Sequence, residues 1–311
     1  MTDTPTLLPD APAGRSGGFA GTAADRFDDA VQERSGRRGL PSALAALRRP
    51  AVVLSVLWLL VLAVAAVAPS VIAPGDPFAG VPADKLQAPS AVHWFGTDQI
   101  GRDLFTRVVH GTSLTLSAAI LAVLVGIVAG SALGLLAGFA GGRVDALVMR
   151  AADVLLAIPG LLLSLAIITA LGFGTVNVAI AVGAASIASV ARIMRSEVLR
   201  VRSSPYVEAA RASGNRELRV LWRHVLPNSA GPVIVLAVLE LGGAILAVSA
   251  LSFLGYGAAP PAAEWGSLVS GGRDYLRNAW WLTTLPGIAI ILTVLATGRV
   301  SRALDTRGGR R

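Results

Sequence analysis

The 311-residue chain is 54% hydrophobic and only 15% charged, whereas soluble domains carry about 25% charged residues. This composition excludes an ordinary water-soluble globular protein. The chain has no Cys, which excludes disulfides, thiolate catalysis and cysteine-ligated metal sites. Its three His are far apart in sequence, and its single Lys, Lys85, does not lie in a Gly-rich turn. We therefore expect no metal site, no catalytic residues and no nucleotide-binding P-loop.

The first 49 residues differ from the rest of the chain. They mix Gly, Pro, Ala, Thr, Ser, Asp and Arg without hydrophobic periodicity, a composition typical of disordered segments. No apolar core follows a basic start, so the segment does not read as a signal peptide. We expect residues 1–49 to form a disordered cytoplasmic tail that ends at Arg48 and Arg49.

Five long stretches of the remaining sequence carry almost no charge. They cover residues 50–75, 108–142, 154–191, 228–263 and 278–298. Each is long enough for a helix to cross about 30 Å of hydrocarbon. The third has room for two helices that turn at 172–174, so the sequence predicts six transmembrane helices. Pro159 and Pro286 lack a backbone N–H and should bend the helices that contain them.

The predicted fold class is all-α, a polytopic membrane protein with six transmembrane helices. The expected segments are a first transmembrane helix at 50–75, an extracytoplasmic loop at 76–111, a five-helix core at 112–303 and a cytoplasmic tail at 304–311. Lys and Arg accumulate on the cytoplasmic side of membrane proteins. With the N-terminus inside, 22 basic residues fall in cytoplasmic segments and 5 in outer loops. Both termini are therefore expected inside, and the net charge of +8 reflects topology and lipid headgroups rather than nucleic-acid binding.

The second predicted span carries glycines at a spacing of four residues. They are Gly126, Gly130, Gly134 and Gly138, which lie on roughly one face of a helix. Such a stripe lets another helix approach closely, which is how helices associate in lipid. The alternative is a helix that is merely rich in small residues, as the whole chain is.

Glu240 is the one ionisable residue near the middle of a predicted span. A carboxylate inside the membrane is costly and usually faces a cavity or a partner. We name Glu240 as a candidate for the translocation path. The alternative is a carboxylate that is protonated or hydrogen-bonded to a neighbouring helix or subunit.

The most informative stretch lies between the fourth and fifth spans, in the predicted cytoplasmic loop 192–228. Ser204 can cap a helix, Pro205 suits its first turn and Gly214 can end it. Glu208 lies early in this helix, where the helix dipole favours a negative charge. A second basic helix is expected from Glu217 to His224, before Leu226-Pro227-Asn228 opens the fifth span. By residue chemistry alone, the short helix is a docking element for a cytoplasmic partner.

This stretch resembles the EAA loop of permease subunits in ATP-binding-cassette (ABC) importers. The matching residues are Tyr206, Glu208, Ala209, Ala210, Gly214, His224, Leu226 and Pro227. The run His224-Val-Leu-Pro-Asn is similar to the dipeptide, oligopeptide and nickel branch. Two outer-loop motifs agree with that branch, namely 93–103 and 251–255 with Trp265-Gly266. The resemblance covers residues 50–305 and fits the C-type permease, although the acidic partner and the proline usual near 297–306 are missing.

The resemblance implies a type I importer permease fold in the cell membrane and a non-catalytic role. It implies a sister permease, ABC ATPase subunits or a two-domain ATPase, and an extracytoplasmic substrate-binding protein as partners. ATP and Mg would be bound by the ATPases, with no cofactor on this chain. The implied cargo is a di- or oligopeptide, with nickel complexes, haem and small glycans as alternatives. The competing class is a self-contained secondary carrier, which would need more intramembrane charge than Glu240 and Asp153 supply.

Two further features have open interpretations. The loop 93–103 is either an outer contact surface or a folded loop whose polar side chains bond one another, because Gly-Thr-Asp and Gly-Arg-Asp also favour turns and caps. Trp265, Trp280 and Trp281 lie near the outer interface, where aromatic residues anchor membrane proteins. We expect them to act as anchors.

Overall fold

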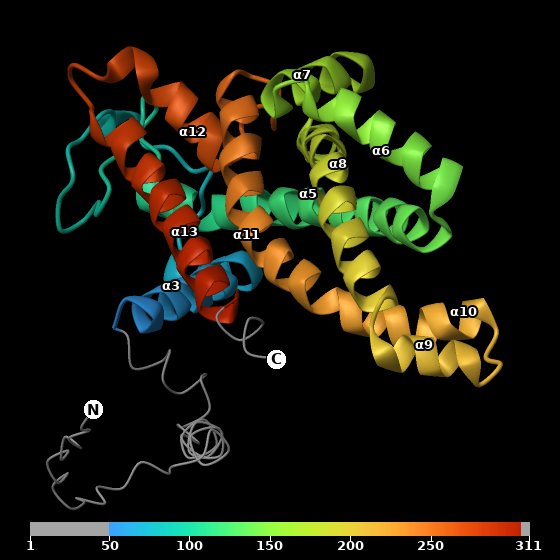
Figure 1. Ribbon diagram of the computed structural model, residues 1–311. Coiled ribbons are helices and arrows are strands. Elements are labelled where there is room, and N and C mark those ends of the chain that lie inside the picture. The colour runs from blue at the N-terminus through green and yellow to red at the C-terminus, as the bar shows by residue number, and fades with distance from the viewer. Residues whose placement is uncertain (1–49, 306–311) are drawn as a thin grey trace, which may run out of the picture. The chain divides into compact units, whose positions relative to one another are not determined.

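The computed structural model describes residues 50–305, so the expectations for the N-terminal tail and for residues 306–311 lie outside the described residues. Regular structure in the described part is helical, apart from two isolated β-bridges. The longer helices are α3 (Pro50–Val67), α5 (Leu104–Ala140), α6 (Gly142–Leu156), α7 (Gly160–Leu171), α8 (Thr175–Arg202), α11 (Leu226–Phe253) and α13 (Trp281–Asp305). The shorter ones are α4 (Pro69–Ile72), α9 (Pro205–Ala212), α10 (Glu217–Val220), α12 (Trp265–Gly272), η1 (Pro82–Asp84), η2 (Leu221–Val225) and η3 (Arg273–Tyr275). Figure 1 labels most of them.

Five helices are long and apolar enough to cross a membrane, when α10 to α11 are counted as one. The bent pair α6 and α7 brings the number to six if the pair is counted as one span. The two helices of this pair meet at 95°, and Pro159 lies at their junction, immediately before α7. The expected bend at Pro159 is therefore a break, whereas Pro286 lies inside the unbroken helix α13. The chain turns between α7 and α8 at Gly172 and Gly174, where φ is +90° and +126°, because glycine adopts positive φ without strain.

Several predicted boundaries are wrong. The first span ends at Val67 rather than at residue 75. Helix α5 begins at Leu104, inside the stretch expected as an outer loop. Helix α13 includes Leu304 and Asp305, which were expected in the tail. Helices α5 and α13 continue past the charge-free windows because their backbone hydrogen bonds and packing persist. Helix α3 ends early because Pro69 disfavours helical geometry at the residue before it.

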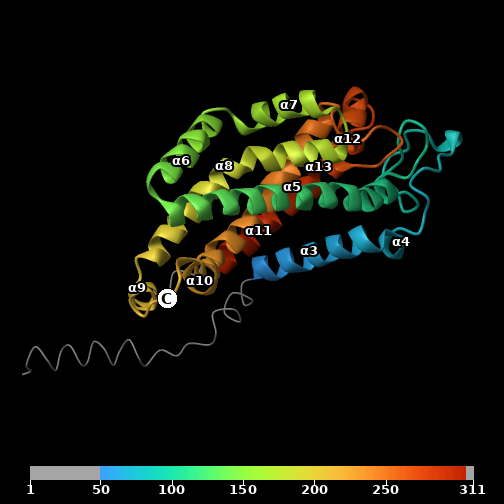
Figure 2. The same cartoon turned by 90° about the vertical axis from the view of Figure 1, so that its right-hand side faces the viewer.

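The glycine stripe of α5 faces α8. A Cβ atom built on Gly126 would collide with the Ser186 side chain, and one on Gly130 would lie 2.6 Å from Cβ of Val190. At Gly134 and Gly138 the nearest α8 side chains are equally close, at 2.7 Å from Met194 Cβ and 2.8 Å from Val198 Cγ1. The two helices lie side by side along most of their length (Figure 2). Small residues at every fourth position permit this close approach.

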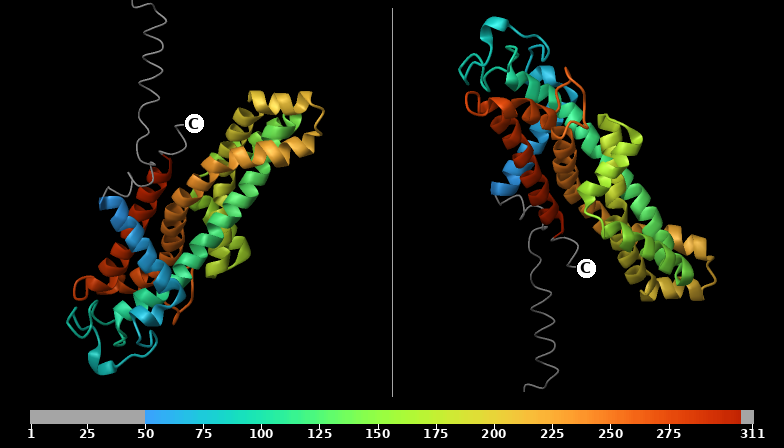
Figure 3. Two further views of the ribbon diagram at one scale, coloured as in Figure 1. Left: turned by 90° about the horizontal axis from the view of Figure 1, so that it is seen from below. Right: turned by 90° about the horizontal axis from the view of Figure 1, so that it is seen from above.

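A main apolar core joins α5, α8, α11, α12 and α13. Its fully buried members include Leu104, Val178, Ile245, Leu251 and Trp265. A second apolar cluster lies where α9 and α10 join α8 and α11. Its buried members are Met194, Val198, Val201, Val207, Val220, Leu221, Val225 and Val233. The loop 73–103 and the helix α9 lie at opposite ends of the helices (Figures 1 and 3).

Two of the three tryptophans that were expected to act as interfacial anchors are buried. Trp265 is fully buried and donates a hydrogen bond from its Nε1 to the Val108 carbonyl, at 2.9 Å. Trp281 is also buried and donates to the Thr97 carbonyl, at 3.2 Å. Of the three tryptophans expected as anchors, Trp280 alone is exposed. The sequence could not separate these roles, because a buried indole with a hydrogen-bond acceptor suits a core as well as an interface.

Glu264, which caps α12, is a buried carboxylate outside the spanning helices. Its side chain is fully buried, and its Oε1 accepts a hydrogen bond from the Gly266 N–H at 3.3 Å. Burial raises the pKa of Glu264 above its ordinary value, since the charged form loses its hydration. The stability that the neutral form contributes is therefore present at acid pH and lost as the pH rises through the folded-state pKa.

We expect Glu264→Gln to raise the melting temperature of the protein more at pH 8 than at pH 5. Glutamine keeps the shape and removes the ionisation that burial opposes. The expected gain at pH 8 is about 2–4 °C for each kcal/mol recovered, measured by thermal unfolding in detergent at both pH values. An equal shift at the two pH values would contradict this assignment of the pH dependence.

Candidate functional site

The docking element expected in the sequence is helix α9. Pro205 occupies its first position, and Ser204 stands at its N-cap. The Ser204 hydroxyl does not cap the helix as expected, because it donates to the Val201 carbonyl at the end of α8, at 2.5 Å. Gly214, with φ of +77°, ends the element and donates its N–H to the Arg211 carbonyl at 2.9 Å. The helix is therefore bounded by the residues that the sequence indicated, with a different hydrogen bond at its start.

Helix α9 is held by one buried side chain. Val207 is fully buried in the second apolar cluster. Asn215 donates to the Ala210 carbonyl at 2.9 Å, and Arg211 forms an ion pair with Glu217 at 3.2 Å. These contacts fix α9 against the ends of its two neighbouring helices, so its position is set by the bundle.

The opposite face of α9 is presented to solvent. Tyr206, Glu208 and Ala209 are exposed, and Ala210 is half-buried. Glu208 forms no ion pair or side-chain hydrogen bond with any residue in 50–305. Ala209 belongs to this exposed face, whereas the half-buried Ala210 packs against the second apolar cluster beside Val207. An unpaired carboxylate on an exposed, fixed helix is available to a partner.

The connection from α9 to the membrane differs from the expectation. Helix α11 begins at Leu226, as expected, but no break precedes it, because residues 217–253 form one continuous 37-residue helix. The turn of η2 is π-helical, with the Leu226 N–H bonded to the Leu221 carbonyl. This wider turn accommodates Pro227, whose missing N–H and ring disturb ordinary α-helical bonding. His224 and Leu226 are half-buried and Pro227 is exposed along it.

A second correction concerns the start of the predicted loop at residue 192. Helix α8 runs to Arg202, so the first basic segment of the loop is the end of a spanning helix. Its arginines are used structurally: Arg195 forms a bidentate ion pair with Asp145 of α6, and Arg192 pairs with Asp153 at 2.6 Å. Arg202 donates to the Phe139 carbonyl at the end of α5, at 2.8 Å. The ends of α5, α6 and α8 are thereby joined beside α9.

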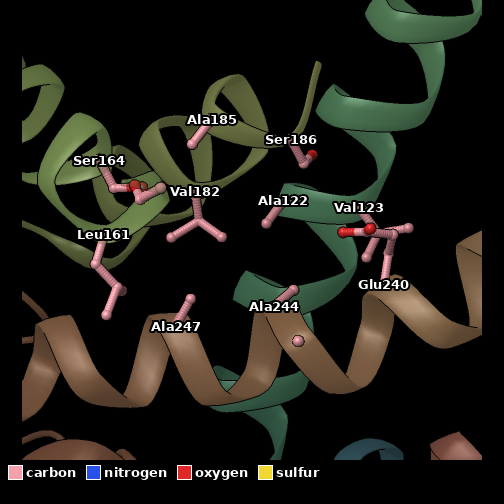
Figure 4. Close-up of a pocket in the computed structure, with 12 residues that line it drawn as sticks. Ala122, Val123, Leu161, Ser164, Val182, Ala185, Ser186, Glu240, Ala244 and Ala247 are labelled. Carbon is pink, nitrogen blue, oxygen red and sulfur yellow. The ribbon is translucent and has the colours of Figure 1, made fainter. Parts of the chain in front are cut away.

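A cavity of about 260 Å³ lies between α5, α7, α8 and α11 (Figure 4). Its lining residues are Ala122, Val123, Gly160, Leu161, Ser164, Val182, Ala185, Ser186, Glu240, Gly243, Ala244 and Ala247. Glu240 is the one ionisable residue among them. Sequence patterns drew attention to Glu240 but not to the cavity, because its walls are small residues from four helices and no spacing brings them together.

The structure does not bring Glu240 into contact with the docking residues. Both Pro227 and Glu240 belong to α11, and thirteen residues at 1.5 Å each separate them by about 20 Å. The uninterrupted helix 217–253 nevertheless begins after the four residues that follow the end of α9, and it runs to the cavity.

The loop 93–103 is folded on itself, as one of its two interpretations expected. Asp98 forms ion pairs with Arg102 at 2.6 Å and with Arg107 at 3.7 Å. Asp103 caps α5 by accepting from the Thr106 N–H, and it contacts Nδ1 of His93 at 3.0 Å. These polar side chains are used within the chain. Residues 50–305 contain no group of three His, Cys, Asp or Glu residues that could hold a metal ion.

Residues 130–309 match a protein-family model described as a binding-protein-dependent transport system inner membrane component. The chain belongs to this family. It is thus a permease component of an ABC importer, as the EAA-like residues of α9 indicated. The matched region contains α9, the continuous helix 217–253 and most of the cavity.

The permease is similar to curated peptide transport proteins. It is 42% identical over 223 residues to a dipeptide transport system permease protein of Alkalihalophilus pseudofirmus, which covers 72% of this chain and 73% of the relative. It is 42% identical over 231 residues to a di/tripeptide transport system permease protein of Pseudomonas aeruginosa, with 72% and 76% covered. A probable D,D-dipeptide transport system permease protein of Escherichia coli is 43% identical over 211 residues, with 68% and 71% covered.

The fold of the permease also resembles solved importers. A crystal structure of an amino acid ABC transporter with histidines matches with a TM-score of 0.52 at 16% identity, over 66% of this chain and 95% of that one. An inward-facing methionine ABC transporter, MetNI, matches with a TM-score of 0.50 at 20% identity, over 64% and 96%. At these identities the likeness concerns the fold, and it confirms the expected importer permease architecture.

Proposed function

We propose that this permease is the non-catalytic half of a translocation path for di- and oligopeptides, completed by a sister permease subunit. Support for the cargo comes from the relatives, which are named for dipeptides, tripeptides and glutathione. The alternatives of nickel complexes, haem and glycans have no comparable support. An extracytoplasmic binding protein would deliver the peptide, and ABC ATPases, which bind ATP and Mg, would supply the energy.

The observation that carries the proposal is the geometry of α9. An exposed face with an unpaired Glu208 is fixed to the bundle through the buried Val207. We assign α9 as the coupling helix that docks on an ATPase subunit. Closure of the ATPases would displace α9, and the continuous helix 217–253 would carry the displacement to the cavity. The chain itself then needs no nucleotide, cofactor or metal.

The orientation follows from the same assignment. A helix that docks on ATPases lies on the cytoplasmic side, and the excess of Arg near α9 agrees with this placement. Both termini would then be cytoplasmic, and the loop 73–103 would lie outside. The permease would sit in the cell membrane as a multi-pass subunit.

Single-cysteine labelling tests the assignment, since the natural chain has no Cys. A membrane-impermeant maleimide should label Ala209→Cys only in inside-out vesicles. The matched control, Ser90→Cys in the outer loop, should be labelled only in right-side-out vesicles; both positions are exposed. In parallel, the tagged permease should co-purify from membranes with ATPase and sister permease subunits. Labelling of residue 209 from outside, or purification of a permease that transports alone, would overturn the proposal.

A further inference from the structure

The cavity of Figure 4 has one charged group and otherwise uniform walls. Glu240 is half-buried on α11, and its side chain extends toward Val123 of α5 (Figure 4). It forms no ion pair or side-chain hydrogen bond with any residue of the described part of the chain. A carboxylate in the middle of a spanning helix usually faces a cavity or pairs with a positive group or a hydrogen-bond donor. Within residues 50–305 that partner is missing.

The polar neighbours of Glu240 in the cavity wall do not supply a partner for its carboxyl group. The Ser186 hydroxyl donates to the Gly183 carbonyl at 2.9 Å, and the Ser164 hydroxyl donates to the Gly160 carbonyl at 2.9 Å. Each serine hydroxyl is thus bonded to a backbone carbonyl of its own helix. The remaining walls are Ala, Gly, Val and Leu, which offer no hydrogen bond and no charge from their side chains. The site is therefore a single carboxyl group in a mainly apolar cavity.

We propose that Glu240 binds the protonated α-amino group of a peptide in transit, an inference that rests on the proposed function. An amino-terminal ammonium is common to peptides of any sequence with a free amino end, and it complements a lone carboxylate. Smooth apolar walls accept different side chains without selecting one. At about 260 Å³ the cavity is smaller than the roughly 300–1,000 Å³ of whole-ligand pockets. It therefore fits the amino end of a peptide, with the rest of the cargo continuing along the path.

Two readouts on the reconstituted complex, with its ATPases, sister permease and binding protein, test this inference. In the first, Glu240→Gln should reduce uptake of dialanine about tenfold or more, because the charged hydrogen bond to the ammonium is lost. Glu240→Asp, which keeps the charge, should retain most of the uptake. Both variants should assemble with the sister permease and ATPases as the wild type does.

The second readout places a reporter in the cavity. A thiol at Ala247→Cys, on the same helix and in the same cavity wall, is labelled with a small neutral methanethiosulfonate. Dialanine should slow this labelling, whereas N-acetyl-dialanine, which has no ammonium, should not. In the Ala247→Cys, Glu240→Gln double variant, protection by dialanine should disappear.

The outcomes separate the two proposals. If the wild-type complex takes up dialanine and Glu240→Gln does so equally well, or both peptides protect residue 247 alike, the inference about Glu240 fails and the proposed function stands. If Glu240→Gln loses the sister permease during purification, a residue of that subunit neutralises the carboxylate, and the inference is overturned. If the wild-type complex imports no peptide at all, the proposed function fails and the inference fails with it.

Discussion

Glu208→Arg should abolish peptide uptake while leaving the amount of permease in the membrane unchanged. Glu208 lies in the first turn of α9, is exposed, and has no partner within residues 50–305. Its replacement therefore costs the isolated chain little stability. At a docked interface, reversing a charge places like charges together at a cost of several kcal/mol. We expect uptake to fall at least about 100-fold, which corresponds to roughly 2.8 kcal/mol.

The comparison needs a charge reversal of equal size elsewhere. Asp274 lies at the opposite end of the helices, in η3, and is exposed. Asp274→Arg should leave uptake within about twofold, because the exposed ion pair that Asp274 forms with Arg273 contributes little. Membrane levels of both variants are measured by immunoblot, and ATPase co-purification shows whether docking is lost. Normal uptake by Glu208→Arg would remove α9 as the coupling helix.

Much of the fold could be predicted because the membrane imposes strong sequence constraints. Charge-free windows located the spans, since hydrocarbon excludes charged side chains. The turn at 172–174 followed from two glycines, and the limits of α9 followed from Pro205 and Gly214. In each case one local physical requirement decides the structure.

The parts that could not be predicted depend on contacts between helices. Helices α8 and α11 continue past their apolar windows because Arg195 pairs with Asp145 and the π-helical turn accommodates Pro227. The broken span α6 to α7 carries charges that a hydropathy window rejects, yet Asp145 and Asp153 are paired by α8. Neither pairing has a sequence spacing that reveals it, since the partners are 50 and 39 residues apart.

The candidate site likewise has one part that the sequence predicted, helix α9, and one part that it did not, the cavity. The residues of α9 are contiguous, so their pattern was visible in the sequence. The cavity is built from four helices, and Glu240 was its only visible member. Its walls consist of the same small residues that occur throughout the chain. A cavity that exists because its wall residues are small has no recognisable pattern in the sequence.

Gly134→Ala should lower the stability and membrane abundance of the permease, whereas Gly287→Ala should not. A Cβ on Gly134 would collide with the Ala191 carbonyl oxygen of α8 and lie 2.7 Å from Met194 Cβ. Helix backbone cannot move aside for a methyl group, so α5 and α8 must separate, at an expected cost of about 1–3 kcal/mol. A Cβ on Gly287 of α13 meets no atom within 4 Å, and alanine favours a helix by up to about 1 kcal/mol.

Thermal unfolding in detergent and quantitative immunoblotting of membranes measure the two glycine variants side by side. The effect should extend to transport, because α8 leads directly into α9 and its last turns form the cluster that holds Val207. Separating α5 from α8 would therefore loosen the base of the coupling helix as well as the bundle. A Gly134→Leu variant should lose assembly with the ATPases altogether. If Gly134→Ala and Gly287→Ala unfold at the same temperature, the stripe does not hold α5 against α8, and the rigid support assigned to α9 has another origin.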